Sequence, residues 1–238
     1  MLGWAKEAAT RLGELEAGDD RIEDLAVRVA ELDEELAKLA ATLTNARQTA
    51  ADGFASEIVA ELVPLALPHA RLLFVVSAAE LGPYGADAVE LKFSANPGSE
   101  PQGLAKVASG GELSRIRLAM EVVLATGEAS RTLVFDEVDA GVGGRVATEI
   151  GRRLAQLARH NQVVVVTHLA QVAAFADRHY VVVKSDDGQV TTSGVQLVAD
   201  EQRAAELARM MAGLEASESA LAHAGELVEL AAATRERT

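Results

Sequence analysis

Cysteine is absent from this chain of 238 residues, and aromatic residues make up only 3% of it. The absence of cysteine excludes a disulfide framework and any metal site built on thiolate ligands. The sequence also has no apolar run of about 18 residues, the length that a membrane-spanning helix needs. The first residues, Met1–Lys6, lack the basic and apolar layout of a signal peptide. We therefore expect a cytoplasmic protein with no membrane partner.

Positive charge is also scarce. The chain has 22 Lys and Arg against 36 Asp and Glu, for a formal net charge of −14. Clustered Lys and Arg make most contacts with nucleic-acid phosphates, so this composition argues against a broad nucleic-acid-binding surface. Local basic pairs remain at Arg115 with Arg117 and at Arg152 with Arg153. Any DNA binding by an assembly is expected to rest mainly on other surfaces.

A heptad pattern runs through residues 19–51. Its apolar residues lie alternately three and four positions apart over about four heptads: Ile22, Leu25, Val29, Leu32, Leu36, Leu39 and Leu43. So narrow a seam is typical of a coiled coil, and the alternative is an amphipathic helix packed on its own domain. Gly18 interrupts the seam, which leaves residues 1–17 too short to pair with it. We predict that residues 1–55 are the returning arm of an antiparallel coiled coil whose other arm is absent.

Residues 56–238 alternate between strand and helix patterns. Strands are predicted at residues 71–77, 88–94, 131–135, 162–167, 179–184 and 189–198, the last two around a turn at 186–188. Helices are predicted after Gly110, at 145–159, from His168 to about Asp177, near 200–212 and at 216–233. This order predicts an α/β fold with a mostly parallel sheet and flanking helices.

The segment Lys106–Arg115 leads into one of these helices. Gly110 and Gly111 have no side chains, so a ligand can approach the unpaired N–H groups at the positive end of the helix. Such a helix start favours a phosphate. The alternative is structural, because Ser109 and Glu112 have the spacing of a capping box.

Acidic residues and a histidine follow two of the predicted buried strands. Asp136 and Glu137 end the strand at 131–135, and His168 follows the strand at 162–167. A carboxylate at a strand end can hold Mg²⁺, and the next acid can polarise an attacking water as a general base. His168 can then hydrogen-bond the γ-phosphate or orient that water. Taken singly, the acids could be a surface turn and the histidine a satisfied polar residue.

The order of these motifs resembles that of ABC-type ATPases. Val107–Arg115 resembles their signature motif, Thr132–Glu137 their Walker B, Asp139 their D-loop aspartate and His168 their H-loop. More narrowly, Lys106–Arg115, Phe135–Gly144 and Val166–Ala173 resemble the RecN family of bacterial DNA double-strand-break repair proteins, which are related to SMC proteins. The resemblance covers about residues 55–238, so this part is expected to be the C-terminal lobe of an ABC/SMC-type ATPase head.

The resemblance implies cofactors, partners and site residues. It implies an ATP- and Mg²⁺-dependent head dimer that holds or bridges duplex DNA in the nucleoid, with RecA recombinase as a candidate partner. Catalysis would fall to Glu137 and His168, and Mg²⁺ binding to Asp136. The nucleotide would be bound by Ser109, Gly110, Gly111 and Asp139, the signature residues acting on ATP held by another head.

One expected motif is missing. The sequence contains no Gly-x-x-x-x-Gly-Lys-Ser/Thr phosphate loop, the Walker A motif. We therefore expect a separate N-terminal lobe to supply it, and expect the chain alone to be inactive. The alternatives are a non-catalytic coiled-coil interaction module on a degenerate nucleotide fold, or an SMC- or RecF-type ATPase. A transporter ATPase fits less well, because such chains rarely carry a heptad arm directly before the signature half.

Overall fold

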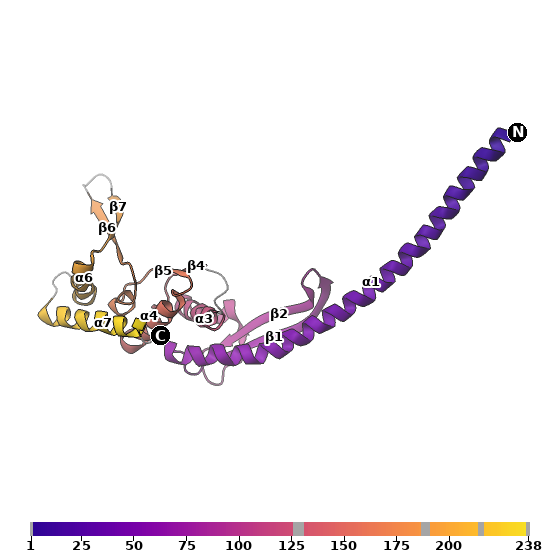
Figure 1. Ribbon diagram of the computed structural model, residues 1–238. Helices are drawn as coiled ribbons and strands as arrows, with labels where there is room; N and C mark the ends of the chain where they lie inside the picture. Colours follow the sequence, from indigo (N-terminus) through magenta and orange to yellow (C-terminus); the bar gives the residue numbers. More distant parts are fainter. Residues whose placement is uncertain (1, 126–130, 187–190, 214–216, 237–238) are drawn as a thin grey trace. The chain divides into compact units, whose positions relative to one another are not determined.

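The computed structural model describes residues 2–125, 131–186, 191–213 and 217–236 (Figure 1). The helices are α1 (Leu2–Leu62), η1 (Val63–Leu65), α2 (Leu104–Val107), α3 (Gly110–Val123), α4 (Gly144–Leu157), α5 (Ala170–Ala173), α6 (Asp200–Ala212) and α7 (Glu218–Glu236). The strands are β1 (Arg71–Gly82), β2 (Gly85–Ser94), β3 (Gln102–Gly103), β4 (Thr132–Phe135), β5 (Gln162–Val165), β6 (Tyr180–Asp186) and β7 (Thr191–Leu197). Within these ranges no helix is long and apolar enough to cross a membrane.

The chain divides into two compact units. The first comprises residues 1–51 and 75–90, and the second comprises residues 52–74 and 91–238. The predicted division at residues 55 and 56 stays a prediction.

The first unit combines most of helix α1 with the β1–β2 turn region. The helix continues through Gly18, and its heptad residues from Ile22 to Leu43 are exposed. The buried carboxylate of Asp87 accepts hydrogen bonds from the Thr44 hydroxyl at 2.8 Å and from Arg47 at 3.1 Å. Arg47 also donates to the carbonyl of Tyr84 at 2.8 Å. These bonds fix the turn region against the helix within this unit.

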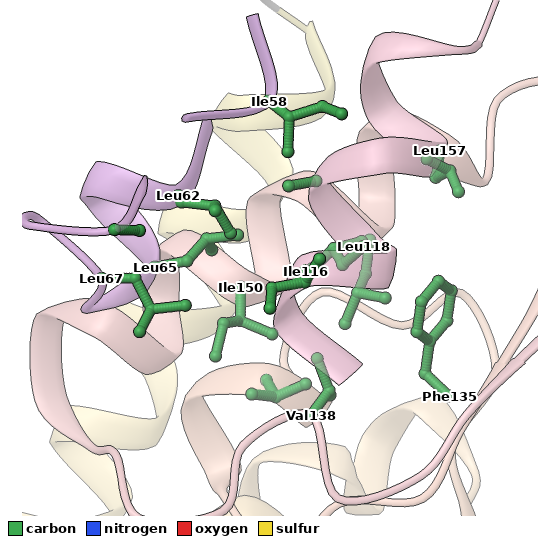
Figure 2. Packing of buried hydrophobic residues seen from close by; sticks show 14 of the residues in the cluster. Ile58, Leu62, Leu65, Leu67, Ile116, Leu118, Phe135, Val138, Ile150 and Leu157 are labelled. Atoms are coloured by element: carbon green, nitrogen blue, oxygen red, sulfur yellow. The ribbon is translucent and has the colours of Figure 1, made fainter. Parts of the chain in front are cut away.

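The second unit has a hydrophobic core formed by helices and by strands β1, β2 and β4 (Figure 2). Its fully buried side chains come from segments far apart in sequence: Ile58, Leu62, Leu65, Ile116, Leu118, Phe135, Val138, Ile150 and Leu157. A second cluster joins the α5 region, α6 and α7 through buried alanines and through Phe175, Leu207 and Leu227. Burial of this much apolar surface is the main stabilising term of the fold.

The mixture of helices with a parallel strand pair confirms the predicted α/β class, although only one of the strand pairings given below is parallel. Strands β4 and β5 pair in parallel, while β2 with β3 and β6 with β7 are antiparallel. Strand β2 lies between β1 and β3 in a three-stranded sheet. The predicted turn at 186–188 falls mostly outside the described residues. The sequence predicts a helix from His168 to about Asp177, but α5 is shorter and ends at Ala173.

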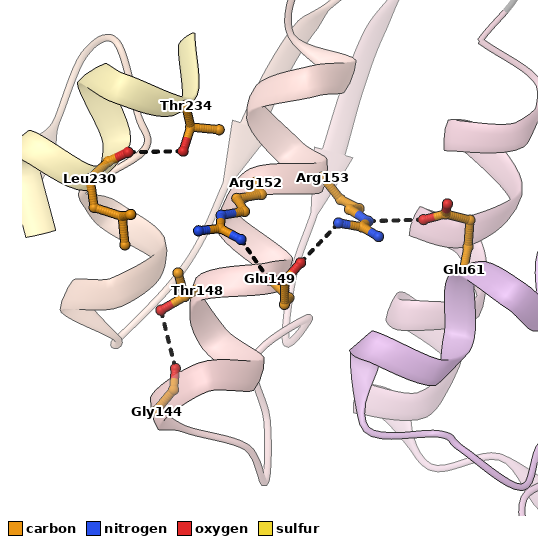
Figure 3. Close-up of polar contacts among 8 residues, drawn as sticks. All are labelled: Glu61, Gly144, Thr148, Glu149, Arg152, Arg153, Leu230 and Thr234. Atoms are coloured by element: carbon orange, nitrogen blue, oxygen red, sulfur yellow. Dashed lines mark hydrogen bonds and ion pairs between the residues drawn. The ribbon is translucent and has the colours of Figure 1, made fainter. Parts of the chain in front are cut away.

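The basic pair on helix α4 is neutralised by acidic neighbours (Figure 3). Arg153 contacts Glu61 and Glu149, both at 2.9 Å, and Arg152 contacts Glu149 at 2.8 Å. This part of the surface therefore offers less free positive charge than the sequence indicates.

Candidate functional site

Strands β4 and β5 bring the predicted acids and histidine to one edge. Their register pairs Thr132 with Gln162 and continues to Phe135 with Val165. One further hydrogen bond, from the Val166 N–H to the Phe135 carbonyl at 3.0 Å, extends this pairing. Because the strands are parallel, the residues that follow them emerge at the same edge of the pair.

Asp136 and Glu137 are exposed at the end of β4. The Glu137 N–H donates to Asp136 Oδ1 at 2.9 Å, and the Asp136 carbonyl accepts from the Ser114 hydroxyl at 2.7 Å. Glu137 has a left-handed backbone with φ of 56°, which is uncommon for a residue with a side chain. Such conformations are held by their surroundings and are frequent at functional sites.

Asp139 differs from these two acids because its carboxylate is buried. Asp139 is 2% exposed, and its Oδ2 accepts hydrogen bonds from the Thr167 hydroxyl and from the His168 N–H at 3.3 Å. The same oxygen lies 3.4 Å from His168 Nδ1, although the His168 side chain is 72% exposed. The structure thus joins the loop after β4 to the loop after β5.

The start of helix α3 is held by the capping box that the sequence indicates. Ser109 Oγ accepts from the Glu112 N–H at 3.3 Å, and Glu112 Oε2 accepts from the Ser109 N–H at 2.8 Å. Ser109 and Glu112 therefore do form the capping box that the sequence offers as an alternative to a phosphate site. The capping box leaves the N–H groups of Gly110 and Gly111 outside it.

The two glycines have different surroundings. Gly110 is exposed, and a methyl group added there would lie 2.5 Å from Glu137 Oε2. Gly111 is buried, and its added methyl group would lie 3.0 Å from the Ala140 carbonyl oxygen. Close packing within this chain thus accounts for Gly111, whereas Gly110 presents open backbone beside the Glu137 carboxylate.

Arg115 is a buried residue for which the sequence pattern predicts no role at the site. Its guanidinium donates to the Ala140 carbonyl at 3.0 Å. Burial lowers the pKa of Arg115, and the nearby Glu112 carboxylate opposes that shift. The sequence pattern does not single out Ser114 or Thr167 either, although both lie beside motif residues. Their position beside motif residues is the one local sign of a role. Their hydrogen-bond partners, Asp136 and Asp139, lie 22 or more residues away in the sequence.

Asp136 fits a magnesium site in which the protein supplies a single carboxylate ligand. Within the described part of the chain, no group of three or more His, Cys, Asp or Glu is arranged to hold a metal. Asp136 is exposed and has a second oxygen beyond the one that binds the Glu137 N–H. Mg²⁺ commonly binds one or two carboxylates and completes its shell with water and substrate phosphates. Asp136 suits this role as a single protein ligand.

Comparison with known proteins gives a consistent family. The chain is 55% identical over 214 residues to the DNA repair protein RecN of Streptomyces coelicolor, covering 84% of this chain and 37% of that protein. It is 46% identical over 252 residues to RecN of Mycobacterium leprae, covering 97% and 43%. RecN of Deinococcus radiodurans is 45% identical over 229 residues, covering 96% and 40%. No family model matches the sequence.

Solved structures of SMC heads also align with the chain. The Smc head domain with a coiled coil and joint from Pyrococcus yayanosii is 20% identical and covers 66% of this chain and 28% of its own, with a TM-score of 0.48. The SMC head domain from Thermotoga maritima is 23% identical and covers 68% and 52%, with a TM-score of 0.34.

The fold places this protein in the class of α/β proteins with a parallel strand pair and a long helical arm. Within that class, the chain belongs to the RecN family. It spans about two-fifths of the length of the relatives named above.

Proposed function

We propose that this chain is the C-terminal half of an ATPase head that dimerises with ATP to hold or bridge duplex DNA during double-strand-break repair. The observation that carries the proposal is the parallel pairing of β4 with β5. It places Asp136 and Glu137 at the same edge as His168, separated by 30 or so residues of chain. The resemblance to RecN and the names of the relatives support the biological setting.

Each motif residue has a proposed task. Asp136 holds Mg²⁺, which when bound would neutralise charge on the transferred phosphoryl group. Glu137 accepts a proton from the attacking water, and His168 hydrogen-bonds the γ-phosphate. Ser109, Gly110 and Gly111 contact the nucleotide of a second head, using the N–H groups of the α3 start. The carboxylate of Asp139 is buried, so its proposed part in nucleotide binding is to hold His168 in place.

The missing phosphate loop requires a partner lobe. Val134, Val164 and Val166 are 52%, 45% and 60% exposed, whereas Leu133 and Phe135 on the other face of β4 are buried. An apolar strand face in water is costly, so this surface suits a covering element. We assign that role to an N-terminal lobe with a Walker A motif. The exposed heptad residues of α1 suit a second arm in the same way.

A chimera tests this proposal. The matching segment of Streptomyces coelicolor RecN would be replaced by this chain, and ATP hydrolysis would be compared with that of the chain alone. We expect turnover from the chimera and negligible turnover from the isolated chain, because the Walker A loop supplies most phosphate contacts.

Two variants of the chimera provide the controls. Glu137→Gln should abolish turnover, whereas Glu80→Gln, at an exposed position of β1, should leave it unchanged. An inactive chimera with a folded head would contradict the ATPase proposal. Robust turnover by the isolated chain that depends on Glu137 would contradict the need for a second lobe.

A non-catalytic interaction module is the second candidate function, favoured by the absence of a phosphate loop and by the exposed heptad face of α1. It predicts arm pairing without ATP turnover in the same chimera. A nucleoid-associated cytoplasmic location and RecA as a partner also belong to the proposal, and they rest on the family resemblance.

A further inference from the structure

The loops after β4 and β5 meet at one hydroxyl group. Thr167 lies in the loop after β5, directly before His168, and its hydroxyl donates to Asp139 Oδ2 in the loop after β4. The same oxygen of Thr167 accepts a hydrogen bond from the Leu169 N–H at 3.0 Å. Thr167 therefore uses both its donor and its acceptor capacity at this point.

Asp139 depends on this arrangement. A buried carboxylate is costly unless hydrogen bonds replace the water that it loses. Among the described residues, its carboxylate contacts the Thr167 hydroxyl and the backbone N–H and ring of His168. All three come from the loop after β5, so the carboxylate ties the two loops together.

The position of the His168 ring follows from these contacts. The ring is largely exposed; the backbone N–H of His168 donates to Asp139 Oδ2, and Nδ1 of the ring lies 3.4 Å from the same oxygen. The backbone is restrained on both sides of His168. Before it, the Thr167 hydroxyl is bonded to Asp139; after it, the Leu169 N–H is bonded to the Thr167 oxygen. Without the hydroxyl, Asp139 would lose one of its hydrogen bonds from the loop after β5, and the Leu169 N–H would lose its acceptor.

We infer that Thr167 is a positioning residue of the ATPase site, which holds the D-loop carboxylate of Asp139 and the H-loop His168 in one fixed arrangement. The inference rests on the proposed function. Thr167 acts through its two neighbours and does not contact the nucleotide. Its removal should therefore impair the chemical step more than ATP binding.

The test uses the active chimera described above, with Thr167→Val and Thr167→Ser. Valine keeps the shape of threonine but can neither donate nor accept, whereas serine keeps the hydroxyl. We expect Thr167→Val to lower kcat by about tenfold, in line with the loss of a hydrogen bond to a charged group, with little change in KM for ATP. Thr167→Ser should restore most of kcat.

A double variant tests whether the effect passes through Asp139. If it does, Thr167→Val combined with Asp139→Ala should be no slower than Asp139→Ala alone, because each change removes one partner of the same hydrogen bond. Amide exchange of the isolated chain gives a readout without ATP. Thr167→Val should speed exchange at the His168 and Leu169 amides, and Thr167→Ser should not.

The outcomes separate this inference from the proposed function. Equal kcat values for threonine, valine and serine in an active chimera would overturn the positioning role alone. Equal losses with valine and serine would also overturn it, because the hydroxyl would then be irrelevant. A folded but inactive unsubstituted chimera would overturn the proposed function and the positioning role with it.

Discussion

At the scale of single residues, the neighbouring glycines of helix α3 face different neighbours. The added methyl group of Gly110→Ala would meet the end of the flexible Glu137 side chain, which can move away. That of Gly111→Ala would meet the backbone carbonyl of Ala140, which packing holds in place. We expect Gly111→Ala to lower the free energy of unfolding by about 1–3 kcal/mol, as overpacking does. Gly110→Ala should change it by less than about 0.5 kcal/mol.

Denaturant unfolding of both variants of the isolated chain measures this difference. The two substitutions have the same chemistry and adjacent positions on one helix, so each is the matched control for the other. Equal losses of stability would show that the Ala140 contact does not distinguish the glycines.

The same scale shows which parts of the site the sequence could predict. Asp136, Glu137 and His168 follow apolar runs, and the ends of parallel strands place such residues together. The burial of Asp139 was not predictable, because it depends on Thr167, which lies 28 residues away. The link from Arg115 to Ala140 likewise spans 25 residues. Local pattern gives the candidates, and long-range packing gives their surroundings.

At the scale of elements, most helices and strands follow from periodicity and turn residues, but helix α5 does not. The sequence predicts a helix to about Asp177, and the helix ends at Ala173. The Arg203 guanidinium of α6 donates to the carbonyls of Ala173, Ala174 and Ala176. A continued helix would need some of these carbonyls for its own N–H groups. A side chain 27 or more residues away thus competes with the local pattern.

His179 near helix α6 provides a pH-dependent prediction. Burial lowers the pKa of His179, the Glu206 carboxylate opposes this shift, and Arg203 and Arg209 add to it. As the pH falls below about 6.5, His179 therefore binds a proton in the unfolded chain before it does so in the folded chain. The stabilising contribution of neutral His179 is complete above that pH and is lost progressively as the pH falls toward the folded pKa.

Thermal or denaturant unfolding between pH 7.5 and 5.5 measures this effect. We expect the stability to decrease on acidification, and His179→Gln to make the decrease smaller. His160→Gln, at an exposed position after α4, is the control and should leave the pH dependence unchanged. The lowered pKa of Glu206, caused mainly by its hydrogen bond with Arg209, acts at more acidic pH and does not interfere. An identical pH dependence in His179→Gln and the unsubstituted chain would contradict the prediction.

At the scale of the whole molecule, the long helix α1 is predictable because a heptad seam is a local pattern, whereas its pairing in a coiled coil stays a prediction. The assignment of residues 75–90 to the same compact unit as residues 1–51 is not predictable. It depends on the hydrogen bonds of Asp87 with Thr44 and Arg47, which span 40 or more residues. The extended strand β1 therefore contributes to both units, a feature that periodicity alone does not reveal.

The last prediction concerns assembly of two heads. In the chimera, Glu137→Gln keeps the volume of the side chain but removes the proposed base, while Asp136 and the α3 start remain intact. ATP should then bind without being hydrolysed, and the composite site should keep two heads together. Size-exclusion chromatography with light scattering should show more dimer with ATP than without it. Glu80→Gln should show no such lasting increase, because its heads still hydrolyse ATP and separate. A Glu137→Gln chimera that binds ATP yet stays monomeric would contradict a site shared between two heads.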